Sequence, residues 1–193
     1  MTAQLEALLA ELAEFGQARD AAAASHVEKM LNCGPDTGRL LWILARFGGC
    51  RRVLEIGTSN GYSTLWLADA AERVVTIEQD PTKRVMALEN FRRSGLAPGI
   101  ALVGGDAGEL LAGGLGTPFD LVFLDADRGR YVQWWPAVRP SVAMGGLLAV
   151  DNVLSHPQEC APFLDLLRAD PSFTTQTVAT GNGVTLAYRT RKD

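Results

Sequence analysis

The sequence predicts one α/β domain built on an open, mostly parallel sheet with an antiparallel hairpin at its end. Five short apolar runs alternate with helical segments between residues 52 and 151. Each run is apolar without interruption, which is typical of parallel strands covered by helices on both faces. Two further β-rich runs near the C-terminus are joined by a loop that contains two glycines. A chain of 193 residues fits a single domain, here taken as residues 1–193.

The first 50 residues contain two predicted helices. Leucines recur at helical spacing from Leu5 to Leu12, and apolar residues do so again over 40–44. A loop rich in helix breakers, residues 32–36, separates the two helices, and the glycine pair at 48–49 ends the second.

The rest of the chain alternates between strands and helices. One helix is predicted over 63–71, and another begins at Pro81 with Asp80 as its N-cap and ends at Gly95. The predicted parallel strands are 53–56, 74–77, 100–103, 120–124 and 146–150, and the hairpin strands are 173–178 and 184–189.

Composition excludes several classes of protein. The net charge of −4 argues against a non-specific nucleic-acid binder, which needs a basic face. No apolar run reaches the roughly 20 residues of a membrane span, and the acidic N-terminus does not resemble a signal peptide. Three cysteines without C-x-x-C spacing predict free thiols in a reducing compartment, so we expect a cytoplasmic protein.

Acidic side chains stand at or near the carboxyl ends of all five predicted parallel strands. These ends meet at one edge of an open sheet, which is where such folds bind ligands. Any one of the acids could be the N-cap of the next helix. Five together predict a ligand site at this edge. They are Glu55, Glu78, Asp106, Asp125 and Asp151.

The loop after the first strand has glycines only at positions 57 and 61. It therefore lacks the third glycine of a dinucleotide-binding turn, and no Gly-Lys-Ser/Thr follows as in a nucleotide-binding P-loop. Glu78 lies 21 positions after Gly57, where an acid can accept hydrogen bonds from ribose hydroxyls. The pattern favours a nucleoside-type ligand without a diphosphate.

Residues 53–64, VLEIGTSNGYST, resemble the first motif of class I S-adenosylmethionine-dependent methyltransferases. More narrowly, they resemble the cation-dependent small-molecule O-methyltransferases, the caffeoyl-CoA and catechol O-methyltransferase family. The resemblance continues through 76–78, 105–107, 123–127, 151–153 and 181–186. It implies a three-layer α/β/α Rossmann-like class I methyltransferase fold with a mostly parallel seven-stranded sheet, and a homodimer.

The resemblance also implies roles for individual residues, and it makes residues 1–50 part of the cover over the substrate. Asp125 and Arg128 would be catalytic, and Asn182 would touch substrate. Asp125, Asp151 and Asn152 would bind a divalent metal ion. The cofactor S-adenosylmethionine would be bound by Glu55, Gly57, Thr58, Ser59, Ser63, Glu78, Asp106, Ala107 and Asp125.

The chemistry of the residues agrees with a metal site. Asp125 and Asp151 end two strands that should be neighbours, about 4.8 Å apart. Two carboxylates this close repel each other unless a cation lies between them. With the amide oxygen of Asn152 they form an all-oxygen set that suits Mg²⁺, or Mn²⁺ or Ca²⁺, better than zinc. Such an ion could chelate two vicinal hydroxyls and lower the pKa of one.

Arg128 is a departure from the family pattern, in which a lysine proposed as the base commonly stands three positions after the first metal aspartate. An arginine stays protonated and cannot accept a proton. Three readings stay open: the metal alone acidifies the hydroxyl, Arg128 stabilises the oxyanion, or activity is low. His156 could be a substitute base.

The acceptor is expected to be a small phenol or catechol rather than a CoA ester, because only about 50 residues precede the first motif. Trp134 and Trp135 are expected in the core, although they could line a phenol pocket or a dimer interface. Three alternatives stay open. The protein could methylate a hydroxylated uridine in transfer RNA, could be a nicotinamide-dependent oxidoreductase, or could bind cofactor without catalysis.

Overall fold

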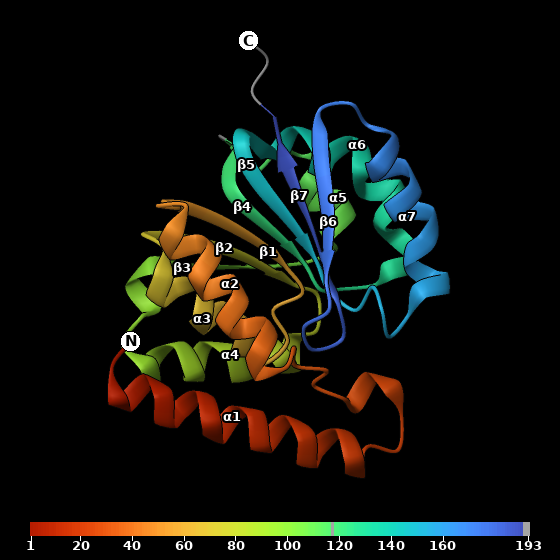
Figure 1. Ribbon diagram of the computed structural model, residues 1–193. Coiled ribbons are helices and arrows are strands. Elements are labelled where there is room, and N and C mark those ends of the chain that lie inside the picture. Colours follow the sequence, from red (N-terminus) through yellow and green to blue (C-terminus); the bar gives the residue numbers. More distant parts are fainter. Residues whose placement is uncertain (117, 191–193) are drawn as a thin grey trace.

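The computed structural model describes residues 1–116 and 118–190, and its centre is a seven-stranded sheet (Figure 1). The strand order is β3-β2-β1-β4-β5-β7-β6. Strands β1 to β5 are parallel, and β7 runs antiparallel between β5 and β6. This confirms the predicted fold class. The strands are β1 Arg52–Ile56, β2 Arg73–Glu78, β3 Ile100–Gly104, β4 Phe119–Leu124, β5 Val142–Val150, β6 Phe173–Val178 and β7 Val184–Arg189.

Helices form a layer on each face of the sheet (Figure 1). The first four lie on one face, and the last three lie on the other. The helices are α1 Ala3–Ala22, α2 Pro35–Phe47, α3 Tyr62–Ala70, α4 Pro81–Ser94, α5 Ala107–Ala112, α6 Tyr131–Ser141 and α7 Pro157–Ala169, with short 3₁₀ turns at His26–Glu28, Ala97–Gly99 and Arg128–Arg130. In the described part of the chain, no helix is long and apolar enough to cross a membrane.

Strand β5 is longer than the predicted 146–150, because it begins at Val142. The pairing register with β4 shifts between Phe119 and Leu121. Gly145 has φ +80°, a conformation that side chains other than glycine rarely adopt, and it stands in this irregular part. Gly145 and Gly146 therefore mark a distortion within β5, whereas the predicted strand began at Gly146.

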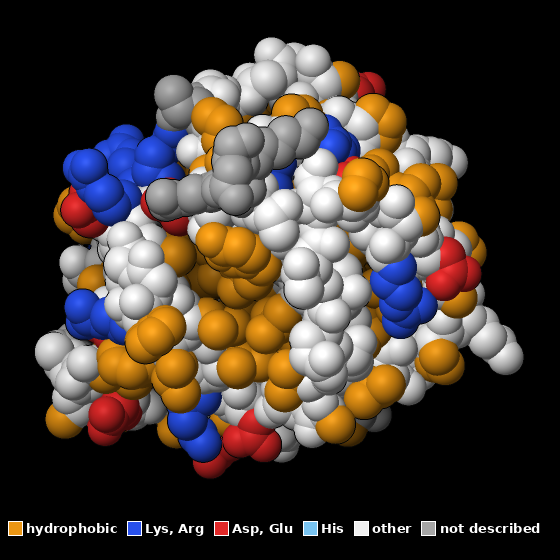
Figure 2. Space-filling model, turned by 45° about the horizontal axis from the view of Figure 1, so that its top comes forward, with side chains coloured by type: hydrophobic (Ala, Val, Ile, Leu, Met, Phe, Trp, Pro, Cys, Tyr) orange, Lys and Arg blue, Asp and Glu red, His pale blue; other side chains and the backbone are white. Residues whose placement is uncertain are grey.

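Helix α2 covers the middle of the sheet, and β7 and β6 extend beyond it (Figure 1). Leu41 and Ala45 of α2 pack on β1, β4 and β5. Figure 2 views the molecule from nearer its top, and hydrophobic side chains gather at the centre of that view around a hollow.

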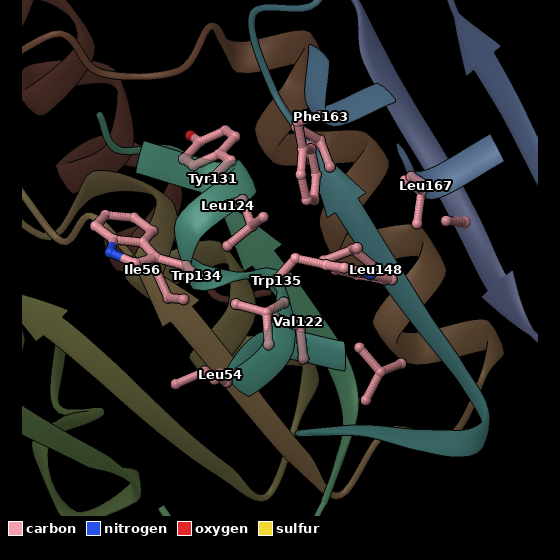
Figure 3. Close-up of a cluster of buried hydrophobic side chains, with 14 of the residues drawn as sticks. Leu54, Ile56, Val122, Leu124, Tyr131, Trp134, Trp135, Leu148, Phe163 and Leu167 are labelled. Atoms are coloured by element: carbon pink, nitrogen blue, oxygen red, sulfur yellow. The ribbon is translucent and has the colours of Figure 1, made fainter. Parts of the chain in front are cut away.

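The opposite face of the sheet carries the larger core cluster (Figure 3). Tyr131, Trp134 and Trp135 of α6 and Phe163 of α7 are buried over β1, β4 and β5. The Trp135 and Phe163 rings meet edge to face with centroids 5.6 Å apart, a favoured aromatic geometry. The expectation that both tryptophans lie in the core is confirmed.

Candidate functional site

The loop after β1 passes against the end of β4. Gly57 has φ +105°, and a Cβ added there would lie 2.0 Å from the backbone oxygen of Asp125. Only glycine permits this approach. The Asp125 N–H donates to the Ile56 carbonyl at 3.0 Å, and the Gly57 N–H donates to the Ile77 carbonyl at 3.1 Å. The carboxyl ends of β1, β2 and β4 therefore meet around this loop, as predicted.

Glu78 is held by two backbone donors. Its Oε2 accepts from the Ser59 N–H at 2.8 Å, and its Oε1 accepts from the Asp80 N–H at 2.9 Å. The Ser59 hydroxyl donates to the Met30 carbonyl at 2.6 Å. The acid at the end of β2 is thus fixed in orientation, and the segment before α2 is tied to the glycine loop. Each carboxylate oxygen keeps a lone pair for a ligand hydroxyl.

Glu55 is fully buried beneath the loop. Its Oε2 accepts from the hydroxyls of Thr64 and Thr76, the latter at 2.6 Å, whereas its Oε1 has no hydrogen-bond partner in the described part of the chain. Burial raises the pKa of Glu55 to about 7, against the opposing effect of the nearby hydroxyl groups of Ser63, Thr64 and Thr76. A buried carboxylate oxygen without a donor is ready to accept from an ammonium group.

Asp125 and Asp151 end the neighbouring strands β4 and β5, whose last paired residues are Leu124 and Val150. The prediction that these strands are adjacent is confirmed. Asp125 Oδ1 accepts from Asn152 Nδ2 at 2.8 Å. Asp151 is 1% exposed, and neither of its carboxylate oxygens has a hydrogen-bond partner among the described residues.

Burial and mutual repulsion make the carboxylate pair Asp125 and Asp151 unfavourable unless a cation lies between them. Burial raises the pKa of Asp151 to about 6. Burial also raises the pKa of Asp125, and the carboxylates of Asp151 and Glu55 raise it further. A divalent cation would relieve both the burial of charge and the repulsion.

The donor atoms fit a hard cation. Two carboxylates and the Asn152 amide oxygen make an all-oxygen set, which suits Mg²⁺, Mn²⁺ or Ca²⁺. Residues 1–116 and 118–190 contain no group of three or more His, Cys, Asp or Glu side chains that could hold a metal ion. The proposed set has two such side chains, and its third ligand is an amide.

Asn182 reaches this set from the loop between β6 and β7. Its Nδ2 donates to Asn152 Oδ1 at 3.1 Å. The N–H groups of Leu154 and Ser155 donate to the Asn182 carbonyl at 3.0 and 3.1 Å. The structure therefore brings the four predicted residues Asp125, Asp151, Asn152 and Asn182 together.

Asp106 has a partner that sequence reasoning missed. Its carboxylate caps α5 by accepting from the Glu109 N–H at 3.1 Å, and both of its oxygens also bind the Arg130 guanidinium. The Arg130 guanidinium, with these hydrogen bonds, lowers the pKa of Asp106. Arg130 in turn stacks on the Trp134 ring at 5.1 Å. Ala107, the other residue predicted beside the adenine, is buried at the start of α5.

Arg128 lies beside the acidic pair. Its Nε donates to Glu159 Oε2 of α7 at 2.9 Å, and its charge opposes the rise in the pKa values of Asp125 and Asp151. His156 is exposed, and its Nδ1 shares a hydrogen bond of 2.9 Å with the Ser155 hydroxyl. Glu159 lies in no sequence motif, so the sequence alone could not identify it as the partner of Arg128.

Cys33, just before α2, and Thr37, in the first turn of α2, contribute side chains that no motif predicted. Cys33 is buried, and the carboxylates of Asp125, Asp151 and Glu55 add to the burial that raises the pKa of its thiol. Thr37 is fully buried, and its hydroxyl has no hydrogen-bond partner in the described structure. The N-terminal region therefore closes over the acids.

The amino-acid sequence is similar to known O-methyltransferases. A sequence model described as O-methyltransferase matches residues 2–190. Proteins named catechol O-methyltransferase from Mycobacterium tuberculosis and Niastella koreensis are 44% and 34% identical over 123 and 131 residues. These alignments cover 61% and 64% of this chain but only 54% and 59% of those relatives.

Structural comparison also finds a similar O-methyltransferase. The O-methyltransferase from Streptomyces achromogenes that is involved in tomaymycin synthesis, in complex with SAM, superposes with a TM-score of 0.82 at 27% identity. The superposition covers 95% of this chain and 90% of that one. The motif resemblance is therefore confirmed, and the chain belongs to the O-methyltransferase family.

Proposed function

We propose that the protein transfers the methyl group of S-adenosylmethionine to a hydroxyl of a small catechol-like or phenolic acceptor, with the help of a divalent cation. The proposed role of a divalent cation is supported chiefly by Asp151, a buried carboxylate whose two oxygens have no hydrogen-bond partner in the described chain. Asp125, Asp151 and Asn152 would hold the cation, with Mg²⁺ the first choice.

The cofactor-binding roles follow from the free acceptors. Glu55 Oε1 would accept from the ammonium of the methionine part, because it is buried and has no partner among the described residues. Glu78, fixed by Ser59 and Asp80, would accept from the ribose hydroxyls. Gly57, Thr58 and Ser63 would line the methionine pocket, and Asp106 and Ala107 would flank the adenine.

When bound, the cofactor supplies an electrophilic methyl group and the cation lowers the pKa of an acceptor hydroxyl. The chain's own part is to hold the acceptor in line with the methyl group, for which positioning can contribute about 7–11 kcal/mol. Asn182 would help to orient the acceptor, since it contacts Asn152. Arg128 cannot take the proton, but its guanidinium would stabilise the developing oxyanion.

A small catechol acceptor is supported by the names of two relatives, both catechol O-methyltransferase. A relative from Eucalyptus globulus, 26% identical over 191 residues, is named caffeoyl-CoA O-methyltransferase 1 and represents the alternative of a CoA-ester acceptor. We propose a free catechol or phenol here, acting in the cytoplasm, in a homodimer. The three cysteines are free, as a reducing compartment requires.

The test is methyl transfer from labelled S-adenosylmethionine to a panel of catechols, with Mg²⁺ and with EDTA. We expect product with Mg²⁺, loss of product in EDTA, and loss in Asp151→Asn. Asp165→Asn, on the exposed surface of α7, is the matched control and should keep full activity. Turnover that is unchanged in EDTA would refute the metal role. Cofactor binding without product on any acceptor would favour a non-catalytic binder.

A further inference from the structure

Arg128 lies near the acidic pair Asp125 and Asp151 but is bound to a different carboxylate. Its Nε donates to Glu159 Oε2 at 2.9 Å. Among the described residues Arg128 forms this ion pair and none with Asp125 or Asp151. Burial raises the pKa of both acids of the pair, and the charge of Arg128 opposes that rise, so the guanidinium is within electrostatic reach of them.

The acidic pair is an attractive partner for a guanidinium when no cation is bound. Asp151 is 1% exposed, and neither of its carboxylate oxygens has a hydrogen-bond partner in the described part of the chain. Such a buried carboxylate costs free energy, and arginine satisfies carboxylates well because it can donate two parallel hydrogen bonds. Arg128 and a divalent cation would therefore compete for the same negative charge.

The backbone on both sides of Arg128 is fixed, so the side chain alone can change its partner. Asp127 caps the 3₁₀ turn that begins at Arg128, because its Oδ1 accepts from the Gly129 N–H at 3.1 Å. The Tyr131 hydroxyl accepts from the Ala126 N–H at 2.8 Å and donates to the Ala126 carbonyl at 3.2 Å. The available carboxylates decide whether the guanidinium lies against α7 or over the acidic pair.

Glu159 is fixed relative to the proposed metal ligands. The His156 N–H donates to the Asn152 carbonyl at 3.0 Å, and the Cys160 N–H donates to the His156 carbonyl at 3.1 Å. Helix α7 therefore begins directly from the segment that carries Asn152. Glu159 lies in the first turn of α7, where the positive end of the helix dipole favours a carboxylate.

We infer that Glu159 is a positioning residue, which holds the Arg128 guanidinium against α7 and so keeps the acidic pair open for a divalent cation. Glu159 engages only Nε, and the two Nη groups have no partner among the described residues. They stay available to the oxyanion of the acceptor. Arginine suits this double task because its fork of donors can serve two partners at once. The inference rests on the proposed function, since it requires that Asp125 and Asp151 bind a cation.

Binding of Mn²⁺ to the protein without cofactor or acceptor tests this role. Mn²⁺ suits the same oxygen ligands as Mg²⁺, and electron paramagnetic resonance measures the free ion in a titration. Competition by Mg²⁺ checks that both ions use one site. Glu159→Gln should weaken Mn²⁺ binding by about 5-fold or more, because the released guanidinium pairs with the acids. Arg128→Gln should bind Mn²⁺ more tightly than the wild type, because a positive charge is removed.

The double variant separates release of Arg128 from simple loss of a negative charge. In the Arg128→Gln background, Glu159→Gln should change Mn²⁺ affinity by less than about twofold, because no guanidinium remains to be released. Asp165→Asn is the matched control, since Asp165 lies on the same helix, is exposed and pairs with Arg168. It should leave Mn²⁺ affinity unchanged.

Equal weakening by Glu159→Gln with and without Arg128 would overturn the inference, because Glu159 would then act by its charge alone. So would a Glu159→Gln variant that binds Mn²⁺ as the wild type does, or one that loses no more affinity than Asp165→Asn. Circular dichroism and thermal unfolding check that the variants fold, and Glu159→Ala replaces Glu159→Gln if it fails this check. A wild type that binds no Mn²⁺ and no Mg²⁺ would overturn the proposed metal role together with this inference, whereas the other results overturn the inference only.

Discussion

Replacing Glu55 with glutamine should stabilise the cofactor-free protein, and the gain should be larger at pH 8 than at pH 5.5. Burial raises the pKa of Glu55 from 4.5 to about 7 in the folded state. The folded carboxyl therefore holds a proton between pH 4.5 and 7 that the unfolded carboxyl has lost. Because the folded state binds more protons in this window, the stability of the wild type falls as pH rises through it. Glutamine does not titrate, so the variant lacks this loss.

The size of the effect follows from the two pKa values. Relative to a carboxyl that stays neutral, ionisation of Glu55 destabilises the folded state by about 1 kcal/mol at pH 5.5 and by about 3 kcal/mol at pH 8. The difference in unfolding free energy between Glu55→Gln and wild type should therefore grow by about 2 kcal/mol from pH 5.5 to pH 8. Any effect of the amide itself on packing or on Thr64 and Thr76 is common to both pH values and cancels.

Urea unfolding followed by circular dichroism, at pH 5.5 and pH 8 without cofactor, measures this difference. Glu14→Gln, at an exposed position of α1, controls for the loss of one negative charge. Glu55→Gln should also lose affinity for S-adenosylmethionine, because the side chain proposed to bind the cofactor's ammonium group is neutral in this variant. If the stability difference is the same at both pH values, Glu55 does not titrate in this window and the reasoning fails.

Three further predictions concern the metal site, Arg128 and the glycine loop after β1. Millimolar Mg²⁺ should raise the melting temperature of the wild type but not of Asp151→Asn in a thermal-shift assay, and equal shifts would contradict the metal assignment. Arg128→Ala should lower kcat by about 10–100-fold, whereas Arg128→Lys should keep most of it and add a basic limb to the pH–rate profile; an unchanged kcat in the alanine variant would exclude a role in the reaction. Gly57→Ala should destabilise the protein by about 3 kcal/mol or more in urea unfolding, because its Cβ would meet the Asp125 carbonyl oxygen. The control is Gly49→Ala, at φ +59° in open space, which should lower the free energy of unfolding by only about 1 kcal/mol.

The fold could be predicted because its signals are local. Uninterrupted apolar runs identified the buried strands, and the loop at 179–183 identified the hairpin. The convergence of the acids followed from one geometric rule, that parallel strands of one sheet end at the same edge. The start of β5 was wrong, because Gly145 and Gly146 suggest a break where the strand continues with a distortion.

The parts that were missed depend on contacts between distant segments. Arg130 binds Asp106 across 24 positions, and Glu159 binds Arg128 across 31. Met30 accepts from the Ser59 hydroxyl across 29. Arg130, Glu159 and Met30 lie in no pattern of spacing or composition, so their contacts with the predicted residues appear only when helices and strands are packed.

Hydrogen-bond partners separate acids that the sequence presents as equivalent. Glu78 and Asp106 have both carboxylate oxygens engaged by donors of the chain itself. Glu55 has one oxygen engaged, and Asp151 has none among the described residues. A buried carboxylate without a partner costs free energy, so it persists only where another requirement outweighs that cost. Glu55 and Asp151 have buried carboxylate oxygens without a hydrogen-bond partner among the described residues, and these two acids are assigned to an ammonium group and a divalent cation, the two positively charged partners of the proposed reaction. If these assignments hold, each ligand would stabilise the folded protein by engaging acceptors that the chain itself leaves without a donor.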